Sequence, residues 1–209
     1  MTPRAVFSAL ATAALLGGCV KPSATVEIYQ ACAPPAPTAS GCVYPTGTCS
    51  LSPLDTYTID VDVADRLFLA VEVHNQLTDN SSVDTGTGNT HNAYVNHYSV
   101  GFSASLPGTS GDIENAVPSA GSSVIGVELI NGDTWTALYN QLHGTTNTVR
   151  MTADLKLSGV YGDQSHFETA PRKFGIEVCA GCFTPGTCTS GTITYCPGPG
   201  IWPASAACL

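Results

Sequence analysis

The chain has 209 residues, a formal net charge of −9 and only 11% charged residues, with 21 glycines and 14 prolines. The acidic balance leaves no basic surface to neutralise nucleic-acid phosphates, so we expect no nucleic-acid partner. A chain of this length favours one domain with a sizeable core, and so little charge favours an extracytoplasmic β protein over a cytosolic helical one.

The first 18 residues predict a secretory signal peptide. A single positive charge, Arg4, precedes an apolar run without charges at residues 5–16, and two small residues follow it. This is the layout of a signal peptide with its cleavage site. The run is also shorter than the roughly 20 apolar residues that a membrane-spanning helix needs.

The end of this segment, Leu16-Gly17-Gly18-Cys19, resembles the lipobox of bacterial lipoproteins. The resemblance implies that the signal is removed before Cys19 and that fatty acids such as palmitate are attached to this residue. Two acyl chains anchor a protein without a basic patch, and only Lys21 lies nearby. In enteric members of that family, an aspartate after the cysteine is linked with inner-membrane retention. Val20 stands there instead, so we expect an outer-membrane location, with the periplasmic or cell-surface face left open.

Residues 19–52 predict a Pro-rich tether and a disulfide-pinned loop. Tandem prolines around Pro34 and Pro35 favour an extended polyproline II backbone, which cannot join the interior of a sheet. One strand is expected within this segment, at residues 25–29.

Alternating apolar and polar residues predict a β domain over residues 53–178. Strands are expected at residues 57–63, 67–74, 94–106, 124–130, 149–160 and 174–178, with loops at 77–93 and 107–115. One short helix is expected after Asn131, capped by Asp133 and stopped by Gly144. This pattern predicts an all-β fold, an antiparallel two-sheet sandwich of immunoglobulin- or fibronectin-like architecture, with a partly closed barrel as the alternative.

Nine cysteines are the second strong feature of the chain. With Cys19 reserved for lipid, eight remain in an oxidising compartment, where an even number indicates disulfides. Three lie before the β domain and five in a Cys-rich tail at residues 179–209, so full pairing requires at least one bridge between the two clusters. A bridge that closes so long a loop would contribute about 4–5 kcal/mol. The individual pairs stay open among Cys32, Cys42, Cys49, Cys179, Cys182, Cys188, Cys196 and Cys208.

The segment Cys179-Ala180-Gly181-Cys182 admits two other interpretations. With Cys188 and Cys196 it could supply four thiolates to a zinc ion, but the second pair is not closely spaced as in a zinc ribbon. A redox-active pair needs a cysteine of low pKa at the start of a helix, and here the pair follows an expected strand. We therefore expect disulfides, and no cofactor besides the covalent lipid.

Weak candidate ligands for calcium lie in and after a polar loop. Asp79 and Asp84 lie in a polar loop that precedes His91 and His97, and hard oxygen ligands suit calcium. The loop lacks the glycine and the closing glutamate of an EF-hand at the needed positions. Solvated loop residues are therefore the preferred interpretation, and we expect no metal site.

No catalytic residues are expected. Asp60, Asp62 and Glu72 lie on the polar faces of expected strands and could pair as general acid and base, but surface carboxylates explain them as well. The chain contains no Gly-x-Ser-x-Gly elbow, His-Glu-x-x-His helix or Walker loop.

Aromatic side chains are the best candidates for a binding surface. Tyr94 and Tyr161 lie near the ends of expected loops and are expected to be exposed to a glycan or a protein, whereas Tyr98 and Trp135 are expected in the core.

A second resemblance covers more of the chain. The stretches His74-Asn75-Gln76-Leu77, Asn89-Thr90-His91-Asn92 and Val178-Cys179-Ala180-Gly181-Cys182-Phe183 are similar to stretches in predicted lipoproteins of gliding and predatory Gram-negative bacteria. That family has no assigned activity to carry over, so the resemblance implies class and location alone.

Together these features predict a non-catalytic lipoprotein of the outer membrane that acts in surface interaction or envelope structure. Its partners would be the membrane, through the lipid, and an envelope protein or glycan. A secreted hydrolase with a nonstandard site and a calcium-dependent binding module are the alternatives.

Overall fold

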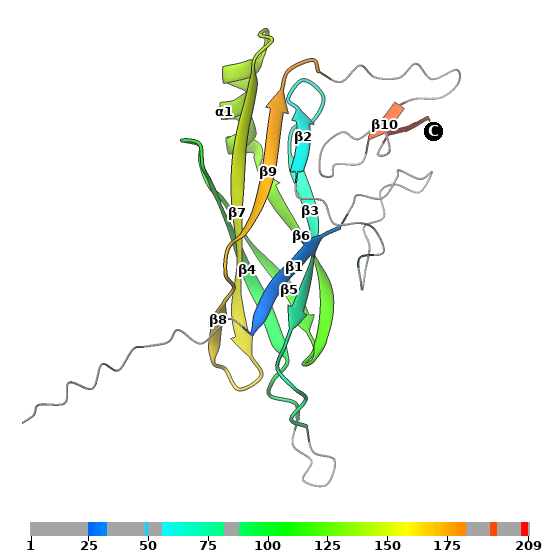
Figure 1. Ribbon diagram of the computed structural model, residues 1–209, viewed down its shortest axis with the longest axis vertical. Helices are drawn as coiled ribbons and strands as arrows, with labels where there is room; N and C mark the ends of the chain where they lie inside the picture. Colours follow the sequence, from blue (N-terminus) through cyan, green and yellow to red (C-terminus); the bar gives the residue numbers. More distant parts are fainter. Residues whose placement is uncertain are drawn as a thin grey trace, which may run out of the picture.

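The computed structural model describes residues 25–32, 49, 56–81, 88–182, 193–195 and 206–208. Within these residues the chain is all-β, with a single helix among the strands (Figure 1). The elements in chain order are β1 (Val26–Ala31), β2 (Thr56–Asp60), β3 (Leu67–Asn75), β4 (Ala93–Phe102), β5 (Thr109–Val117), β6 (Gly121–Ile130), α1 (Gly132–Leu142), β7 (Thr148–Tyr161), β8 (His166–Glu168), β9 (Arg172–Cys179), β10 (Ile193–Tyr195) and β11 (Ala206–Cys208).

The larger sheet has six strands. Five follow the order β2-β9-β7-β4-β5, and β8 pairs with the last residues of β7. The 14-residue strand β7 is central and pairs antiparallel with both β4 and β9. β2 and β9, however, run parallel, with Asp60 opposite Cys179. The prediction of a purely antiparallel fold is therefore wrong at this edge, where two strands far apart in the sequence pair without a hairpin.

The smaller sheet has three strands, in the order β1-β3-β6. The middle strand, β3, pairs antiparallel with both neighbours. β1 corresponds to the strand expected at residues 25–29, and its pairing with β3 makes it part of the folded domain rather than of a tether. In the tail, β10 and β11 form a separate antiparallel ladder.

One hydrophobic core takes side chains from both sheets. Leu69 and Val71 of β3 and Ile125 of β6 belong to the same buried cluster as Leu155 of β7 and Phe174 of β9. Along β7 every second residue is buried from residue 151 to residue 161, as the alternating sequence predicted. Burial of this apolar surface is the main force that holds the two sheets together.

The expected strands are confirmed in position, with differences at their ends, but four of the described strands were not predicted: β5, β8, β10 and β11. The strand expected at residues 57–63 ends at Asp60, because a turn follows in which the N–H groups of Val63 and Ala64 bond to the Asp60 carbonyl. The loop expected at residues 107–115 is wrong, because most of it belongs to β5. That strand buries only its end residues, Thr109 and Val117, so its sequence carries no apolar alternation.

A β-bulge at Asn96 interrupts β4. The register with both β5 and β7 shifts between Val95 and His97. Because a bulge adds one residue to a strand, the buried positions change from Ala93 and Val95 before it to Tyr98 and Val100 after it. The bulge therefore turns the side chains at the start of β4 relative to the rest of the strand.

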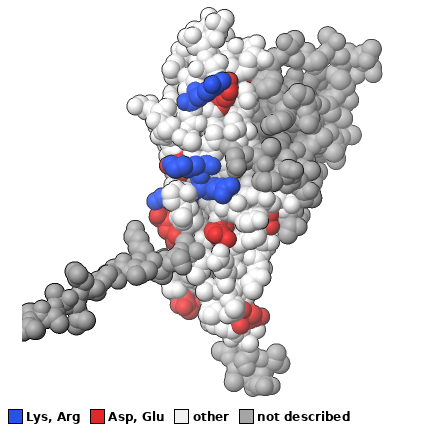
Figure 2. All heavy atoms as spheres, in the orientation of Figure 1, with Lys and Arg blue, Asp and Glu red and all other residues white. Residues whose placement is uncertain are grey.

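The face drawn in Figure 2 is largely uncharged, and the Lys and Arg side chains on it lie next to Asp or Glu (Figure 2). Strands β7, β8 and β9 contribute three such ion pairs between exposed side chains. Exposed pairs of this kind contribute only about 0–1 kcal/mol each, so their main effect is to neutralise charge. The pairs are Arg150–Glu177 at 3.3 Å, Lys156–Glu168 at 2.8 Å and Lys173–Asp154 at 3.0 Å.

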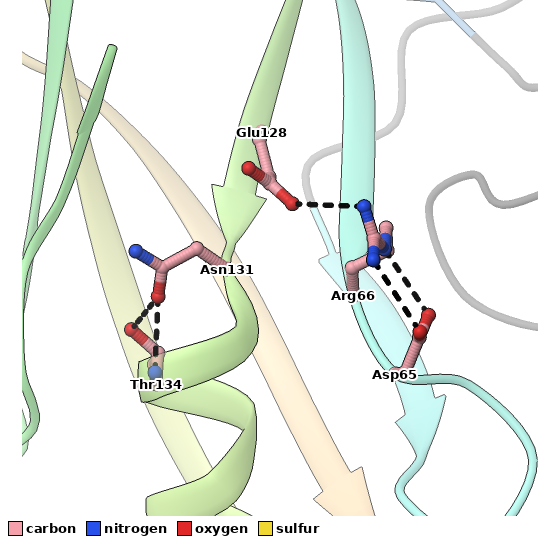
Figure 3. A network of polar contacts seen from close by, with 5 residues as sticks. All are labelled: Asp65, Arg66, Glu128, Asn131 and Thr134. Carbon is pink, nitrogen blue, oxygen red and sulfur yellow. Dashed lines mark hydrogen bonds and ion pairs between the residues drawn. The ribbon is translucent and has the colours of Figure 1, made fainter.

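Asn131 caps helix α1 (Figure 3). Its Oδ1 accepts hydrogen bonds from the backbone N–H and the hydroxyl of Thr134, each at 3.0 Å. The expected cap, Asp133, lies instead inside the first turn, where its negative charge interacts favourably with the positive end of the helix dipole. Gly144 follows the helix with a φ of +74°, a conformation that glycine adopts without strain. In the part of the chain that the structure describes, no helix is long and apolar enough to cross a bilayer.

Arg66 connects the start of β3 to β6 (Figure 3). Its guanidinium group lies 3.2 Å from the Asp65 carboxylate and 3.9 Å from that of Glu128 on β6. Both carboxylates raise the pKa of Arg66, and the hydrogen bond that Arg66 donates to Asp65 has the largest effect. This small polar network lies close to the N-terminus of α1 and marks the point where the smaller sheet leads into the helix.

Candidate functional site

A shallow pocket of about 340 Å³ opens on β4 and β5. Tyr94 is the only aromatic residue in its lining, and this residue is 46% exposed. An aromatic ring beside a few polar groups is the usual chemistry of a small-molecule or glycan site. We call it the Tyr94 pocket, which is lined by Tyr94, Val95, Asn96, Glu114, Asn115 and Ala116.

The strands on both sides of β4 position the Tyr94 pocket. Against β7, Asn96 is the extra residue of the bulge, whereas two residues of β5, Ile113 and Glu114, lie opposite it. Asn115 on β5 is held by β6, because its Oδ1 accepts a hydrogen bond from the Ser123 hydroxyl at 2.8 Å. On the other side, Gly159 of β7 approaches so closely that a Cβ there would lie 2.0 Å from the Tyr94 carbonyl oxygen. The backbone of Tyr94 is thus placed by a contact that only glycine permits.

A second group of reactive side chains lies where β2 and β9 end. The parallel register places Asp60 opposite Cys179, and Cys182 follows three residues later. One Asp60 carboxylate oxygen and the sulfurs of Cys179 and Cys182 all lie within 4.8 Å of one another. No other three His, Cys, Asp or Glu side chains in the described residues come together in this way. We call these three residues the cysteine–carboxylate cluster.

Backbone amides hold the Asp60 carboxylate in place. Its Oδ1 accepts hydrogen bonds from the N–H of Asp62 at 3.0 Å and from that of Gly181 at 2.9 Å. Gly181 has a φ of +65°, which lets the chain turn tightly between the two cysteines. The prediction that Asp60 faces solvent is wrong, because its exposed fraction is 0%. Cys179 is buried as well, whereas Cys182 is exposed.

Helix α1 adjoins the exposed side of this cluster. Asp62 Oδ1 lies 2.7 Å from Nδ1 of His143, directly after the helix. His143 stacks on Tyr139, with 4.4 Å between ring centroids, and Tyr139 stacks on Trp135 at 4.9 Å. We call Trp135, Tyr139 and His143 the aromatic row. Trp135 packs against the core as expected, but it is only partly buried.

The two disulfides of the described residues both lie within a cluster of cysteines, one at each end of the chain. Cys32 pairs with Cys49 and Cys179 with Cys182, over sequence separations of 17 and 3 residues. In the chain-entropy model, loops of these sizes contribute about 3 and about 2 kcal/mol. A bridge between the two clusters stays a prediction, and with these pairs formed it would have to start from Cys42.

A third polar group surrounds Glu72 on β3. The Glu72 carboxylate accepts a hydrogen bond from Gln30 Nε2 on β1 at 2.7 Å and lies 3.0 Å from His74 Nε2. The His74 ring stacks on Tyr29, with 4.3 Å between centroids. Burial alone would raise the pKa of Glu72, but the hydrogen bonds from His74 and Gln30 outweigh it and lower the pKa from its ordinary value.

We expect Glu72→Gln to cost about 1–3 kcal/mol of unfolding free energy at pH 7, because it removes hydrogen bonds to a buried charge. The folded-state pKa lies below the unfolded one, so this contribution is present above the unfolded pKa of about 4.3 and is lost as the pH falls through the folded value. Urea unfolding at pH 7, 5, 4 and 3 should show that the difference in unfolding free energy between wild type and variant decreases as the pH falls. A gap that stays constant would contradict the assignment, and the exposed Glu114→Gln serves as the control.

The weak calcium candidates are held by separate contacts. Asp79 Oδ1 accepts a hydrogen bond from the N–H of Ser81 at 2.7 Å, and His91 Nδ1 lies 2.6 Å from the Thr78 carbonyl oxygen. His97 lies on β4 and pairs with Asp112 of β5 at 3.0 Å. Asp84 lies outside the described residues.

The candidate catalytic carboxylates are divided between the two sheets. Glu72 lies in the smaller sheet, whereas Asp60 and Asp62 lie at the end of β2 in the larger one, so the fold does not bring these three carboxylates into one pair or site. Tyr98 is buried as expected. Tyr161 is buried against the Phe167 ring rather than exposed, and its hydroxyl bonds to Thr25.

The signal peptide, Cys19, Cys42, Cys188 and Cys196 lie outside the described residues, and Cys208 is described by its backbone in β11. Neither candidate ligand site, the Tyr94 pocket or the cysteine–carboxylate cluster, was predicted as a unit from the sequence. Comparison with protein-family models, curated proteins and solved structures found no match to this chain.

Proposed function

We propose that this chain is a non-catalytic lipoprotein of the outer membrane, anchored through Cys19, that binds an envelope glycan in the Tyr94 pocket. The observation that supports binding is the exposed Tyr94 ring in a pocket that Asn96, Glu114 and Asn115 also line. The anchor rests on the resemblance of residues 16–19 to a lipobox.

The lining of the pocket favours a sugar over a flat hydrophobic surface. The face of a tyrosine ring contacts the C–H groups of a sugar, while amide and carboxylate groups bond to its hydroxyls. Glu114 and the net charge of −9 disfavour strongly anionic polymers, so the proposed ligand is a neutral glycan.

The same lining favours binding over hydrolysis. Most glycoside hydrolases use two carboxyl groups about 5–10 Å apart, one on each side of the scissile bond. Glu114 is the single carboxylate that lines the Tyr94 pocket, and the pocket is open rather than deep. A bound sugar would therefore meet polar contacts without the second acid or base.

We also propose that the two sheets form a sandwich of immunoglobulin- or fibronectin-like type. The support is the single core that takes side chains from both sheets. Superposition of a crystal structure on domains of that architecture would test it.

The experiment that tests the function starts from protein extracted in detergent from its native envelope. Its intact mass should exceed that of a chain beginning at Cys19 by the mass of the acyl groups. Titration calorimetry with soluble oligosaccharides from the same envelope, in a neutral and an anionic pool, should then show binding to the neutral pool.

Two variants distinguish binding in the Tyr94 pocket from nonspecific binding. Tyr94→Ala should weaken glycan binding at least ten-fold, because the ring carries the apolar contact. Tyr29→Ala removes a ring of similar exposure, 51% against 46%, on the other sheet and should leave binding unchanged. An unmodified mass would overturn the anchor. No binding, or equal binding by both variants, would overturn the glycan site, and capture of an envelope protein in its place would favour a protein partner.

A further inference from the structure

We propose that Cys179 and Cys182 form a redox-active pair that exchanges disulfides with another molecule, and that Asp60 takes up the proton of reduced Cys179. The proposed non-catalytic role concerns the glycan site in the Tyr94 pocket, and this disulfide exchange is a separate activity that does not depend on it.

The Cys179–Cys182 disulfide is accessible to solvent and contributes little to the stability of the fold. Cys182 is exposed, so a thiol can reach its sulfur from solvent. Exposed disulfides are the ones that exchange most readily with external thiols. The bridge spans only 3 residues in sequence, against 17 for Cys32–Cys49, and short loops constrain the unfolded chain less. Opening it therefore costs the fold comparatively little.

The buried partner, Cys179, has acceptors for a thiol proton. Its sulfur lies 3.4 Å from the Ile59 carbonyl oxygen and within 4.8 Å of an Asp60 carboxylate oxygen. The backbone of Cys179 is fixed by pairing with both β2 and β7. The reduced thiol can thus stay in place without losing a hydrogen-bond partner, and a carboxylate is close enough to take its proton directly or through one water.

The reaction balances as two exchanges. The thiolate of reduced Cys182 attacks a disulfide R–S–S–R, forms a mixed disulfide and releases one RS⁻, which takes a proton from solvent. The Cys179 thiol then passes its proton to Asp60, and its sulfur attacks the Cys182 sulfur. The second RS⁻ leaves and is protonated, the Cys179–Cys182 disulfide forms, and the other molecule has gained two electrons and two protons. The reverse sequence oxidises two external thiols.

The surface next to Cys182 favours a peptide as the source of that disulfide. The aromatic row contacts Asp62 through His143. The Asp62 carboxylate in turn lies near Gly181, because a Cβ added to Gly181 would be 3.8 Å from an Asp62 oxygen. Partly exposed stacked rings bind extended peptide segments better than a small polar thiol. A small disulfide such as glutathione disulfide shares the chemistry, so the experiment includes both sources.

The first measurement uses the folded mature chain in glutathione buffers of increasing reducing strength, quenched by alkylation and mapped by peptide mass. We expect Cys179 and Cys182 to be alkylated under conditions in which Cys32–Cys49 stays intact and the circular dichroism spectrum is unchanged. Opening of the pair only together with Cys32–Cys49, or only on unfolding, would overturn the proposal.

The second measurement follows the rate at which the reduced pair is oxidised, by glutathione disulfide in one arm and by a disulfide-bonded peptide in the other. Asp60→Asn keeps the shape of the side chain and should slow oxidation at least ten-fold, whereas Asp62→Asn should change it less than two-fold. Equal rates in both variants would overturn the role of Asp60. Should Asp60→Asn fail to fold, single-cysteine variants still decide the order of attack. The variant Cys179→Ser retains Cys182, and the variant Cys182→Ser retains Cys179. We expect Cys179→Ser to form a mixed disulfide at least ten times faster than Cys182→Ser.

Discussion

Gly159→Ala should lower the free energy of unfolding by about 3 kcal/mol or more, the upper end of the range for added groups in packed sites. A Cβ at this position would lie 2.0 Å from the Tyr94 carbonyl oxygen and 2.9 Å from the Phe167 ring. The oxygen belongs to a paired strand, β4, and cannot move without breaking the ladder between β4 and β7. Urea unfolding monitored by circular dichroism measures the loss.

The matched control is Gly101→Ala, in the same sheet and on strand β4 itself. No atom lies within 4 Å of the position that its Cβ would take. We expect no loss of stability there, and a gain of up to about 1 kcal/mol, because alanine restricts the unfolded chain. Similar midpoints for the two variants would contradict the close approach of β7 to β4. Since Gly159 also places the backbone of Tyr94, Gly159→Ala should weaken glycan binding as well.

Phe174→Ala should cost about 3–5 kcal/mol, the usual range for removing a fully buried aromatic ring. Phe174 on β9 is 0% exposed and packs against the Tyr57 ring of β2, with 6.2 Å between centroids. The pair therefore supports the parallel edge that carries the cysteine–carboxylate cluster. The measurement is the shift in the urea midpoint at a constant denaturant dependence.

The control is Phe68→Ala, which removes the same atoms from a side chain that is less buried. Phe68 lies on β3, is only partly buried and has the Arg66 guanidinium 5.9 Å from its ring centroid. Because less apolar surface leaves water at this residue, we expect a loss less than half that of Phe174→Ala. Equal losses would contradict the deeper burial of Phe174.

Local sequence patterns predicted the elements whose burial alternates without interruption. In β7 every second residue from Met151 to Tyr161 faces the core, so periodicity alone located this strand and its inner face. The same alternation located β3, although that strand also buries Ala70 and Glu72 on its other face. Strand β5 was missed because it is an edge strand with polar side chains along its middle, and its pairing with β4 imposes the strand. Asn131 rather than Asp133 caps α1, an error of the size expected for element ends.

The candidate sites could not be predicted because they depend on contacts between distant parts of the chain. Alternation places Asp60 outward, but its burial follows from parallel pairing with a strand more than a hundred residues later. Tyr161 was expected to be exposed near a loop, but the Phe167 ring and Thr25 cover it. Tyr94 was predicted to be exposed and is, although the bulge at Asn96, a residue that lines the same pocket, has no signal in the sequence.

The contact between Thr25 and Tyr161 decides which end of the domain would face a bilayer. Tyr161 ends β7, while Cys179 lies opposite Thr148 at the other end of that strand, about 40 Å away at the usual rise per residue (Figure 1). Roughly six residues separate Cys19 from Thr25, a span of about 20 Å when fully stretched. With a lipid on Cys19, the Tyr161 end would sit against the headgroups, and the two cysteines would lie on the side away from the bilayer, in the aqueous phase.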